Sequence, residues 1–190
     1  MPIVGAKEAL VRSALSLFVR NGIDGTSIRE IAEGTGFTNA ALFKHYDSKE
    51  ALALSLFESC YDELSRTVAA PLPDAAFAVQ MRIIISRYVE VMERDLEAAL
   101  YVQENLRRYW TKLPENAGRI SLLGHMRGII LSGKEQGCVD ADKDPRLLVA
   151  AIIGLLGQFA RMIYFEEFRG PASAFVPSLS RLAIDVCRQN

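Results

Sequence analysis

The sequence predicts an all-α fold with an N-terminal three-helix head and a C-terminal bundle of about six helices, nine helices in total. Three observations support this prediction. Apolar residues recur at helical spacing along most of the chain, and strand-like alternation of useful length is absent. Glycine and proline signals divide the chain into segments of helical length. Of the 190 residues, 50% are hydrophobic and 24% are charged, which is typical of a globular protein.

The first helix is expected over about residues 6–20. Apolar residues recur there at i, i+4, i+7 and i+8 from Leu10, so that one face of the helix is buried. Asn21-Gly22 is typical of a helix C-terminus, and Asp24-Gly25 is typical of a turn. The first helix therefore leads directly into a second, closely spaced element.

A helix-turn-helix motif is predicted next. Ser27 and Glu30 have the spacing of a capping box, which predicts that a helix starts at this point. Gly34-Thr35-Gly36 ends that helix, because glycine supplies the positive φ that a tight turn needs. Thr38 is expected to cap the next short helix, and a longer helix is expected over about residues 48–68. Two short helices about a glycine turn are typical of motifs that place the second helix in the major groove of DNA.

This stretch resembles the signature of the tetracycline-repressor (TetR) family of transcriptional regulators. The matching positions are Ile28, Ile31, Ala32, Gly36, Thr38, Leu42, Phe43, His45, Tyr46, Lys49, Glu50 and Leu52. The resemblance covers about the first quarter of the chain. It implies a DNA-binding domain at residues 1–47 and a ligand-binding and dimerisation domain at 48–190, linked by the helix at about 48–68. It further implies a cytoplasmic repressor that binds a palindromic operator as a homodimer and is released by a small, largely apolar ligand.

Base contacts are predicted from the outward face of the third helix. Asn39 can pair with adenine, Lys44 can donate to guanine and Ala40 can contact a thymine methyl group. The alternative for Asn39 is a solvated residue at a helix N-terminus. Hydroxyl groups, ammonium groups and free amides at helix starts are expected to bind phosphates. The complete predicted DNA-binding set is Thr26, Ser27, Arg29, Thr38, Asn39, Ala40, Phe43, Lys44, His45, Tyr46 and Lys49.

The net charge of the chain is −1, and the cations and anions of residues 1–50 balance. This balance disfavours tight DNA binding through bulk electrostatics, since nonspecific affinity comes from neutralised phosphates. The balance is compatible with a few specifically positioned DNA contacts on each subunit, which dimerisation doubles.

Five further helices are predicted in the second domain. They are expected at about 74–94 with Asp74 as the cap, at 96–109, at 115–136, at 145–169 behind Asp144-Pro145, and at 172–188. Breaks are expected at the Lys112-Leu113-Pro114 segment and at Gly170-Pro171.

The helix behind Asp144-Pro145 is apolar nearly all round, which is more than one buried face requires. Together with the family resemblance, this predicts that it and the last helix pair with their copies in a homodimer. The alternative is a central core helix. The residues predicted in the interface are Ile152, Leu155, Leu156, Phe159, Ile163, Leu179 and Leu182.

Aromatic and methionine side chains gather on the expected helices of the second domain. Such residues line apolar ligand pockets, although each also packs in ordinary cores. The charge of the ligand stays open, because a carboxylate favours a cationic ligand whereas Arg161 favours an acidic one. The residues predicted to bind the ligand are Tyr88, Met92, Tyr101, Glu104, Trp110, Met126, Phe159 and Met162.

Other classes of protein fit less well. Catalysis is disfavoured because the chain has only His45 and His125, with no cluster of nucleophile and base and no phosphate-binding glycine loop. The three cysteines are widely spaced, which predicts reduced thiols and no cofactor or metal site. Residues 147–165 are interrupted by Gln158 and Arg161, so no membrane partner is expected. A helical regulator that responds to a protein partner, or acts as an activator, is the alternative function.

Overall fold

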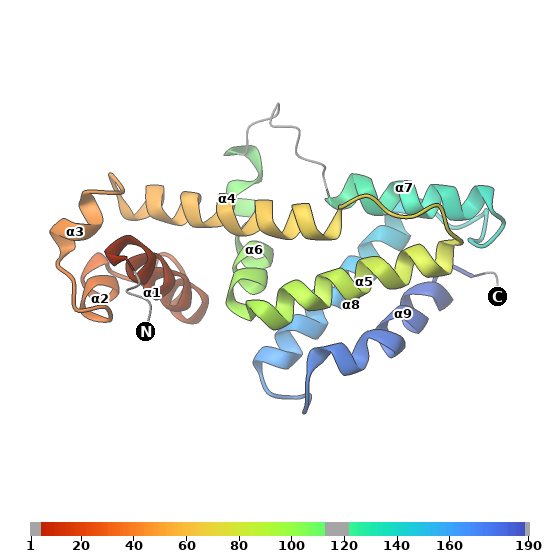
Figure 1. Ribbon diagram of the computed structural model, residues 1–190. Helices are drawn as coiled ribbons and strands as arrows, with labels where there is room; N and C mark the ends of the chain where they lie inside the picture. The colour runs from red at the N-terminus through yellow and green to blue at the C-terminus, as the bar shows by residue number, and fades with distance from the viewer. Residues whose placement is uncertain (1–4, 113–121, 189–190) are drawn as a thin grey trace. The chain divides into compact units, whose positions relative to one another are not determined.

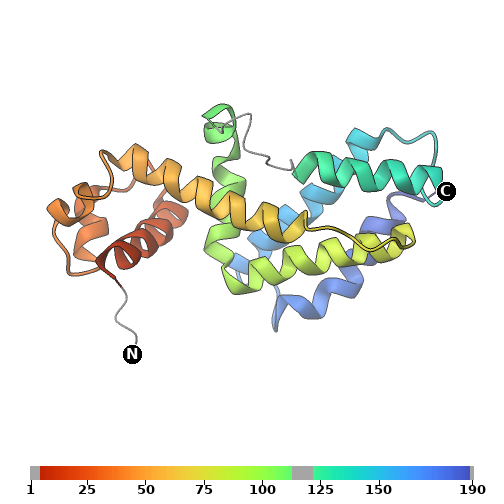
Figure 2. The ribbon, with the colours of Figure 1, turned by 45° about the horizontal axis from the view of Figure 1, so that its top comes forward.

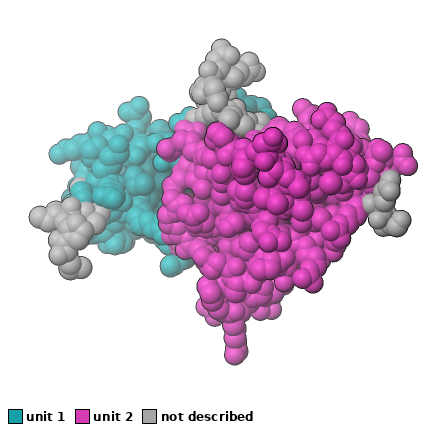
Figure 3. All heavy atoms as spheres, turned by 45° about the vertical axis from the view of Figure 1, so that its right-hand side comes forward, with its two compact units in different colours: residues 1–61, 100–114 teal, residues 62–99, 115–190 magenta. Residues whose placement is uncertain are grey.

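The protein is described by a computed structural model over residues 5–112 and 122–188. Within these ranges the secondary structure consists of nine α-helices and two 3-10 helices, with no strand (Figure 1). The all-α prediction is therefore confirmed. The chain forms two compact units: residues 1–61 with 100–114, and residues 62–99 with 115–190 (Figure 3).

Unit 1 contains the helix-turn-helix motif. Its helices are α1 (Ala6–Asn21), α2 (Ile28–Glu33), α3 (Asn39–Phe43), α4 (Lys49–Val68) as far as Tyr61, α6 (Leu96–Tyr109) from Leu100, and η1 (Trp110–Lys112). Helices α1, α2 and α3 pack against one another, as both ribbon views show (Figures 1 and 2). This packing unit is larger than the expected head, because it includes parts of α4 and α6. The functional division at residue 47 stays a prediction.

Aromatic side chains from α1, α4 and α6 form the core of unit 1. The ring of Phe18 stacks on Tyr101 with centroids 6.0 Å apart, and Phe57 lies 5.2 Å from Tyr109. All four side chains are fully buried. The hydroxyl of Tyr101 donates to the backbone oxygen of Ala53 at 2.9 Å. Helix α6 thus completes the aromatic core of unit 1 together with α1 and α4.

Gly25 lies in the turn between α1 and α2, where its backbone approaches the end of α1. A Cβ atom at this position would lie 2.3 Å from the backbone oxygen of Asn21. We expect Gly25→Ala to lower the free energy of unfolding by about 1–3 kcal/mol, because the backbone of the turn must shift. Gly128→Ala is the matched control in denaturant unfolding. A Cβ there meets nothing within 4 Å, so this change should stabilise helix α7 by about 0.5–1 kcal/mol. Equal effects of the two changes would contradict the steric explanation.

Unit 2 contains the remaining helices around α5. They are the end of α4, α5 (Phe77–Arg94), the start of α6, α7 (Leu122–Glu135), α8 (Pro145–Tyr164), η2 (Ala172–Phe175) and α9 (Val176–Asp185). Helix α5 packs against α7, α8 and α9. Its buried side chains Met81, Ile84 and Ile85 are inaccessible to solvent, so they form the centre of this unit.

Several helix boundaries differ from the predictions. Helix α5 begins at Phe77 behind Ala76, and Asp74 is not its cap. Helix α8 begins behind Asp144 as predicted, but it ends at Tyr164, several residues before Gly170. The last predicted helix is divided into η2 and α9, since Pro177 lies in the first turn of α9. The expected start of the seventh helix, with Leu113 and Pro114, lies outside the described residues.

Candidate nucleic-acid interface

The helix-turn-helix motif has the local structure that its sequence predicts. Ser27 Oγ accepts from the backbone N–H of Glu30 at 3.2 Å, and the Glu30 carboxylate accepts from the backbone N–H of Ser27 at 2.7 Å. This reciprocal pair is the predicted capping box of α2. Gly36 has a φ of 73° in the turn that leads to α3. The turn therefore depends on a residue without a Cβ atom.

Helix α3 has one buried anchor and an exposed outer face. Leu42 is inaccessible and holds the helix to the motif. Asn39, Ala40 and Lys44 are exposed, and the apolar ring of Phe43 is 51% exposed. The side chain of Thr38 makes no capping hydrogen bond, although Thr38 occupies the N-cap position. The predicted base-reading residues thus project from one short helix into solvent.

Thr26 does not belong to this exposed surface. It is 2% exposed, and its hydroxyl lies 2.8 Å from the backbone oxygen of Gly22 and 3.2 Å from that of Leu17. Its Oγ therefore donates within the turn that joins α1 to α2. The prediction that Thr26 contacts a phosphate is wrong, because the hydroxyl is buried and already bonded inside unit 1.

The other predicted phosphate-binding residues differ in their surroundings. The Arg29 guanidinium is 79% exposed and lies 2.6 Å from the Glu33 carboxylate. Lys49 donates from Nζ to the backbone oxygen of Thr26 at 2.7 Å. The Lys7 ammonium lies 5.9 Å from the centre of the half-buried Tyr46 ring, and His45 is exposed. Arg29 and Lys49 would have to exchange an internal partner for a phosphate.

The residues predicted to bind a ligand are divided between the two units. Tyr88, Met92 and Met126 are buried in unit 2. Tyr101 belongs to the aromatic core of unit 1, and its contact with a ligand stays a prediction. Glu104 and Trp110, also in unit 1, are exposed. The remaining two, Phe159 and Met162, line an apolar groove of about 270 Å³ between α8 and α9.

Three buried polar atoms of unit 2 lack a hydrogen bond among the described residues: Ser65 Oγ, His125 Nε2 and Ser180 Oγ. The Nε2 atom of His125 on α7 is buried without a hydrogen bond. Burial lowers the pKa of His125, and the positive charge of Arg87 lowers it further. A neutral imidazole is therefore favoured near neutral pH. No group of three or more possible metal ligands occurs in the described part of the chain.

The residues predicted in the dimer interface divide between the inside and the outside of unit 2. Four of them pack within the chain: Ile152, Leu156, Phe159 and Leu179. Leu155 and Ile163 are half-buried, and Leu182 on α9 is 56% exposed. Further exposed apolar residues, absent from the predicted set, are Leu147 and Ile153 on α8 and Val186 directly after α9. Leu147 lies eight positions before Leu155, and Val186 lies four positions after Leu182, so helical spacing indicates these two residues.

Helix α8 is, among the described residues, long and apolar enough in composition to cross a membrane. Core and interface helices of water-soluble proteins have the same properties. Here one side of α8 packs on α7 and α5, and Leu147 on its exposed surface is 70% accessible. The helix therefore has one face buried in its own chain and a second apolar face without cover from described residues.

Comparisons with known proteins agree with the motif and the fold. Residues 10–56 match the family model of bacterial regulatory proteins of the tetR family. Over 62 residues the chain is 31% identical to IcaR of Staphylococcus aureus, a negative transcriptional regulator of the biofilm operon icaADBC. This match covers 33% of each protein, so the matched part spans about a third of the length of that relative. An uncharacterised helix-turn-helix regulator of Bacillus subtilis, YuxN, is 25% identical over 119 residues, which is 60% of this chain and 40% of YuxN.

Solved structures extend the likeness to nearly the whole chain. A regulatory protein of the tetR family from Rhodococcus RHA1 superposes with a TM-score of 0.81 at 20% identity, covering 96% of each chain. The ketosteroid transcriptional regulator KstR2 of Mycobacterium tuberculosis superposes with a TM-score of 0.78 at 18% sequence identity, covering 99% of this chain and 97% of KstR2. FadR of Bacillus subtilis in complex with stearoyl-CoA superposes with a TM-score of 0.64 at 15% sequence identity, covering 93% of this chain and 96% of FadR. At such low identities these structures establish a shared fold.

The fold and the motif define a helix-turn-helix regulatory protein. Residues 10–56 match the TetR family of bacterial regulatory proteins, and nearly the whole chain shares the fold of a solved structure from that family. Regulators of this family are not enzymes, in agreement with the prediction made from the sequence.

Proposed function

We propose that this protein is a cytoplasmic transcriptional repressor that binds a palindromic operator as a homodimer and is released by a small, largely apolar ligand. The observation that carries the proposal is the exposed face of α3, where Asn39, Ala40 and Lys44 project from a helix anchored by buried Leu42. The second helix of such a motif reads base edges in the major groove. IcaR, which the chain resembles over 62 residues, is a negative transcriptional regulator, and this likeness supports repression.

Each exposed residue of α3 has a chemically suitable partner in DNA. The Asn39 amide matches adenine, the Lys44 ammonium matches guanine, and Ala40 with Phe43 can contact thymine methyl groups. The surrounding residues then bind phosphates and fix the register of the helix. This second group comprises Ser27, Arg29, Thr38, His45, Tyr46 and Lys49.

Glu33 is expected to weaken the DNA contact of Arg29, because its carboxylate holds the guanidinium at 2.6 Å. Glu33→Gln should raise affinity for duplex DNA about twofold to fivefold, which is the equivalent of releasing one exposed ion pair. The gain should shrink as salt concentration rises. Fluorescence anisotropy at several salt concentrations measures it. In an Arg29→Gln background, Glu33→Gln should raise the affinity for duplex DNA only slightly. An equal gain in that background would show that the loss of a negative charge, and not the release of Arg29, raises the affinity.

A homodimer through α8 and α9 is supported by the uncovered apolar face of these helices. Leu147 on α8 is exposed, and half-buried Leu155 and exposed Leu182 line the apolar groove of about 270 Å³. A second copy related by twofold symmetry can cover the same patch on both subunits. Two linked heads bind DNA far more tightly than one, since the second contact becomes intramolecular.

A small ligand is supported by the apolar composition of unit 2, where Tyr88, Met92 and Met126 are buried. The buried Nε2 of His125 offers a polar contact for such a molecule. The related fold of FadR is described in complex with stearoyl-CoA, an acyl compound with a long apolar chain. Ligand binding that favours one conformation by about 1–3 kcal/mol would change operator affinity roughly 5- to 150-fold.

Selection of bound sequences from random duplex DNA tests the proposal. Purified dimer at moderate salt should enrich one palindrome, with half-sites about one helical turn or a multiple apart. Salt-sensitive binding without an enriched sequence would contradict a sequence-specific regulator. A thermal-shift panel of metabolites then tests ligand release. The absence of any stabilising compound would favour the alternative, a regulator that responds to a protein partner or acts as an activator.

A further inference from the structure

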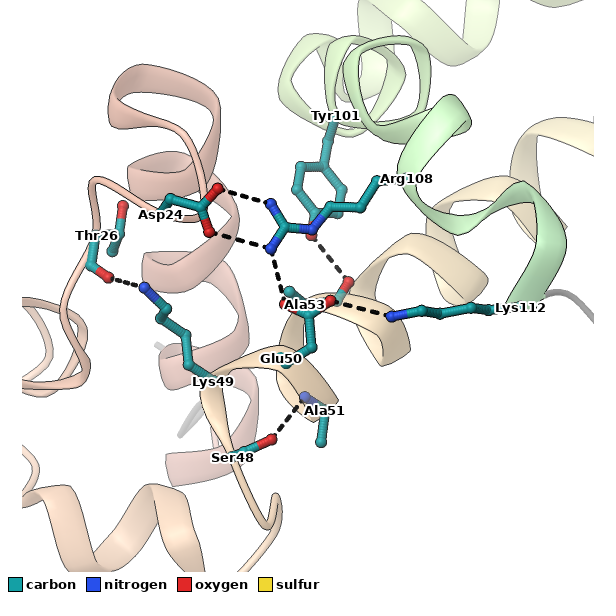
Figure 4. Close-up of polar contacts among 10 residues, drawn as sticks. All are labelled: Asp24, Thr26, Ser48, Lys49, Glu50, Ala51, Ala53, Tyr101, Arg108 and Lys112. Atoms are coloured by element: carbon teal, nitrogen blue, oxygen red, sulfur yellow. Dashed lines mark hydrogen bonds and ion pairs between the residues drawn. The ribbon is translucent and has the colours of Figure 1, made fainter.

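Arg108 on α6 holds two carboxylates with one guanidinium (Figure 4). Its Nη1 and Nη2 atoms donate to the two Asp24 oxygens, both at 3.0 Å. Nη2 also donates to Glu50 Oε2 at 3.0 Å. Lys112 Nζ lies 3.4 Å from the other Glu50 oxygen. This Arg108 fork is confined to unit 1.

The two carboxylates bracket the helix-turn-helix motif. Asp24 lies in the turn before α2, and Glu50 lies in the first turn of α4, just after α3. A second contact joins the same two ends, because Lys49 donates to the backbone oxygen of Thr26 at 2.7 Å. The motif is thus a closed loop of the chain, and both of its ends are bonded to a helix that comes much later in the sequence.

Arg108 lowers the pKa values of both carboxyl groups in this cluster. Its hydrogen bonds and charge hold the pKa of the Asp24 carboxyl below the usual range. Burial raises the pKa of Glu50, but the hydrogen bonds of Arg108, Tyr109 and Lys112 and the charge of Arg108 together outweigh this effect, so that the pKa is lowered. Both groups are therefore ionised at neutral pH. Without Arg108, two anions would face each other at the ends of the motif, where like charges repel.

An arginine suits this position better than a lysine does. Its planar guanidinium binds a carboxylate through two parallel hydrogen bonds, which fix direction as well as distance. Isolated exposed ion pairs contribute little to stability, whereas bidentate pairs within a network are the exception. The aromatic core beneath, in which Tyr101 bonds Ala53 at 2.9 Å, holds the α6 backbone in place. The backbone that carries the Arg108 side chain is therefore held in a fixed position.

We propose that Arg108 is a positioning residue for DNA binding, which fixes both ends of the helix-turn-helix motif and thereby the orientation in which α3 meets the major groove. The inference rests on the proposed function, since it concerns the same DNA contact. Arg108 acts through Asp24 and Glu50 and is assigned no DNA contact of its own.

Arg108→Gln tests the inference against Arg107→Gln, a neighbour on the same helix. Arg107 is exposed and has no contact with Asp24 or Glu50 among the described residues. Both changes remove one positive charge, so any general electrostatic loss is shared. We expect Arg108→Gln to lower affinity for the selected operator about threefold to tenfold relative to Arg107→Gln, the range of coupled charged groups. Affinity for nonspecific duplex DNA should be equal in the two variants.

A double-mutant cycle with Asp24→Asn identifies the fork as the cause. Asp24 is 82% exposed, so this variant should fold normally. Asp24→Asn should lower operator affinity in the wild-type background and cause little further loss in the Arg108→Gln background. Arg108→Lys should lose less operator affinity than Arg108→Gln does. Circular dichroism and thermal unfolding monitor the fold of each variant.

The possible outcomes distinguish failure of the positioning role of Arg108 from failure of the proposed DNA-binding function. Operator affinity equal in Arg108→Gln and Arg107→Gln, with a lowered melting temperature only in the former, would overturn the positioning role and leave a purely structural one. Additive effects of Asp24→Asn and Arg108→Gln would also overturn it. A wild-type protein that enriches no sequence would overturn the proposed function itself.

Discussion

Replacing Leu182 with arginine is expected to leave folded monomers whose operator affinity is lower by about a hundredfold or more, since linkage of two heads contributes about 10²- to 10⁴-fold. Leu182 is 56% exposed in a single chain, so an arginine there is hydrated and tolerated in the monomer. In a twofold interface two unpaired guanidinium groups would be buried, at a cost of several kcal/mol. Sedimentation equilibrium measures the change in mass.

Val79→Arg is the matched control for this prediction. Val79 is also an exposed apolar residue of unit 2, with 49% accessibility, but it lies on α5. This variant should remain a dimer with normal operator affinity. A Leu182→Arg protein that stays dimeric would move the interface away from α9. Leu155→Arg tests α8 in the same way, although its half-buried position makes a loss of folding part of the expected effect.

Asn39→Ala is expected to weaken operator binding by about 1–3 kcal/mol while nonspecific binding changes little. The Asn39 amide is exposed in the first turn of α3, where it can accept from and donate to one adenine. Titration of labelled operator and of a scrambled duplex at the same salt concentration measures the two affinities.

The base itself provides the control for Asn39. When the contacted adenine is replaced, wild-type protein and Asn39→Ala should bind the altered operator equally, because the amide no longer has a matching partner. A constant difference between the two proteins on every operator variant would show that Asn39 affects the fold of α3 or a phosphate contact instead.

Local chemistry accounts for what could be predicted about the motif. The capping box of Ser27 and Glu30 and the positive φ at Gly36 each depend on residues within one turn of the chain. The start of α8 behind Asp144 is similar, because the Asp144 carboxylate accepts from the backbone N–H of Arg146 at 2.8 Å. Such signals need no knowledge of the rest of the fold.

Helical periodicity was less informative about burial on α8. It identified an apolar helix but did not separate Ile152 and Phe159, which pack inside unit 2, from Leu147, which is exposed. A helix that is apolar on most of its surface offers more than one apolar face, and periodicity does not show which of them packs inside the chain. The position of its neighbours decides which side is buried.

The sequence by itself thus determined the helical class, the helix-turn-helix motif and the exposed residues of α3, because capping, turns and amphipathic spacing act over a few residues. Only the tertiary structure decided that Tyr101 and Arg108 of α6 belong to the same unit as the motif. Asp24 and Arg108 are 84 positions apart. Periodicity predicts that a side chain is buried or exposed, whereas its partner is chosen by packing between distant segments.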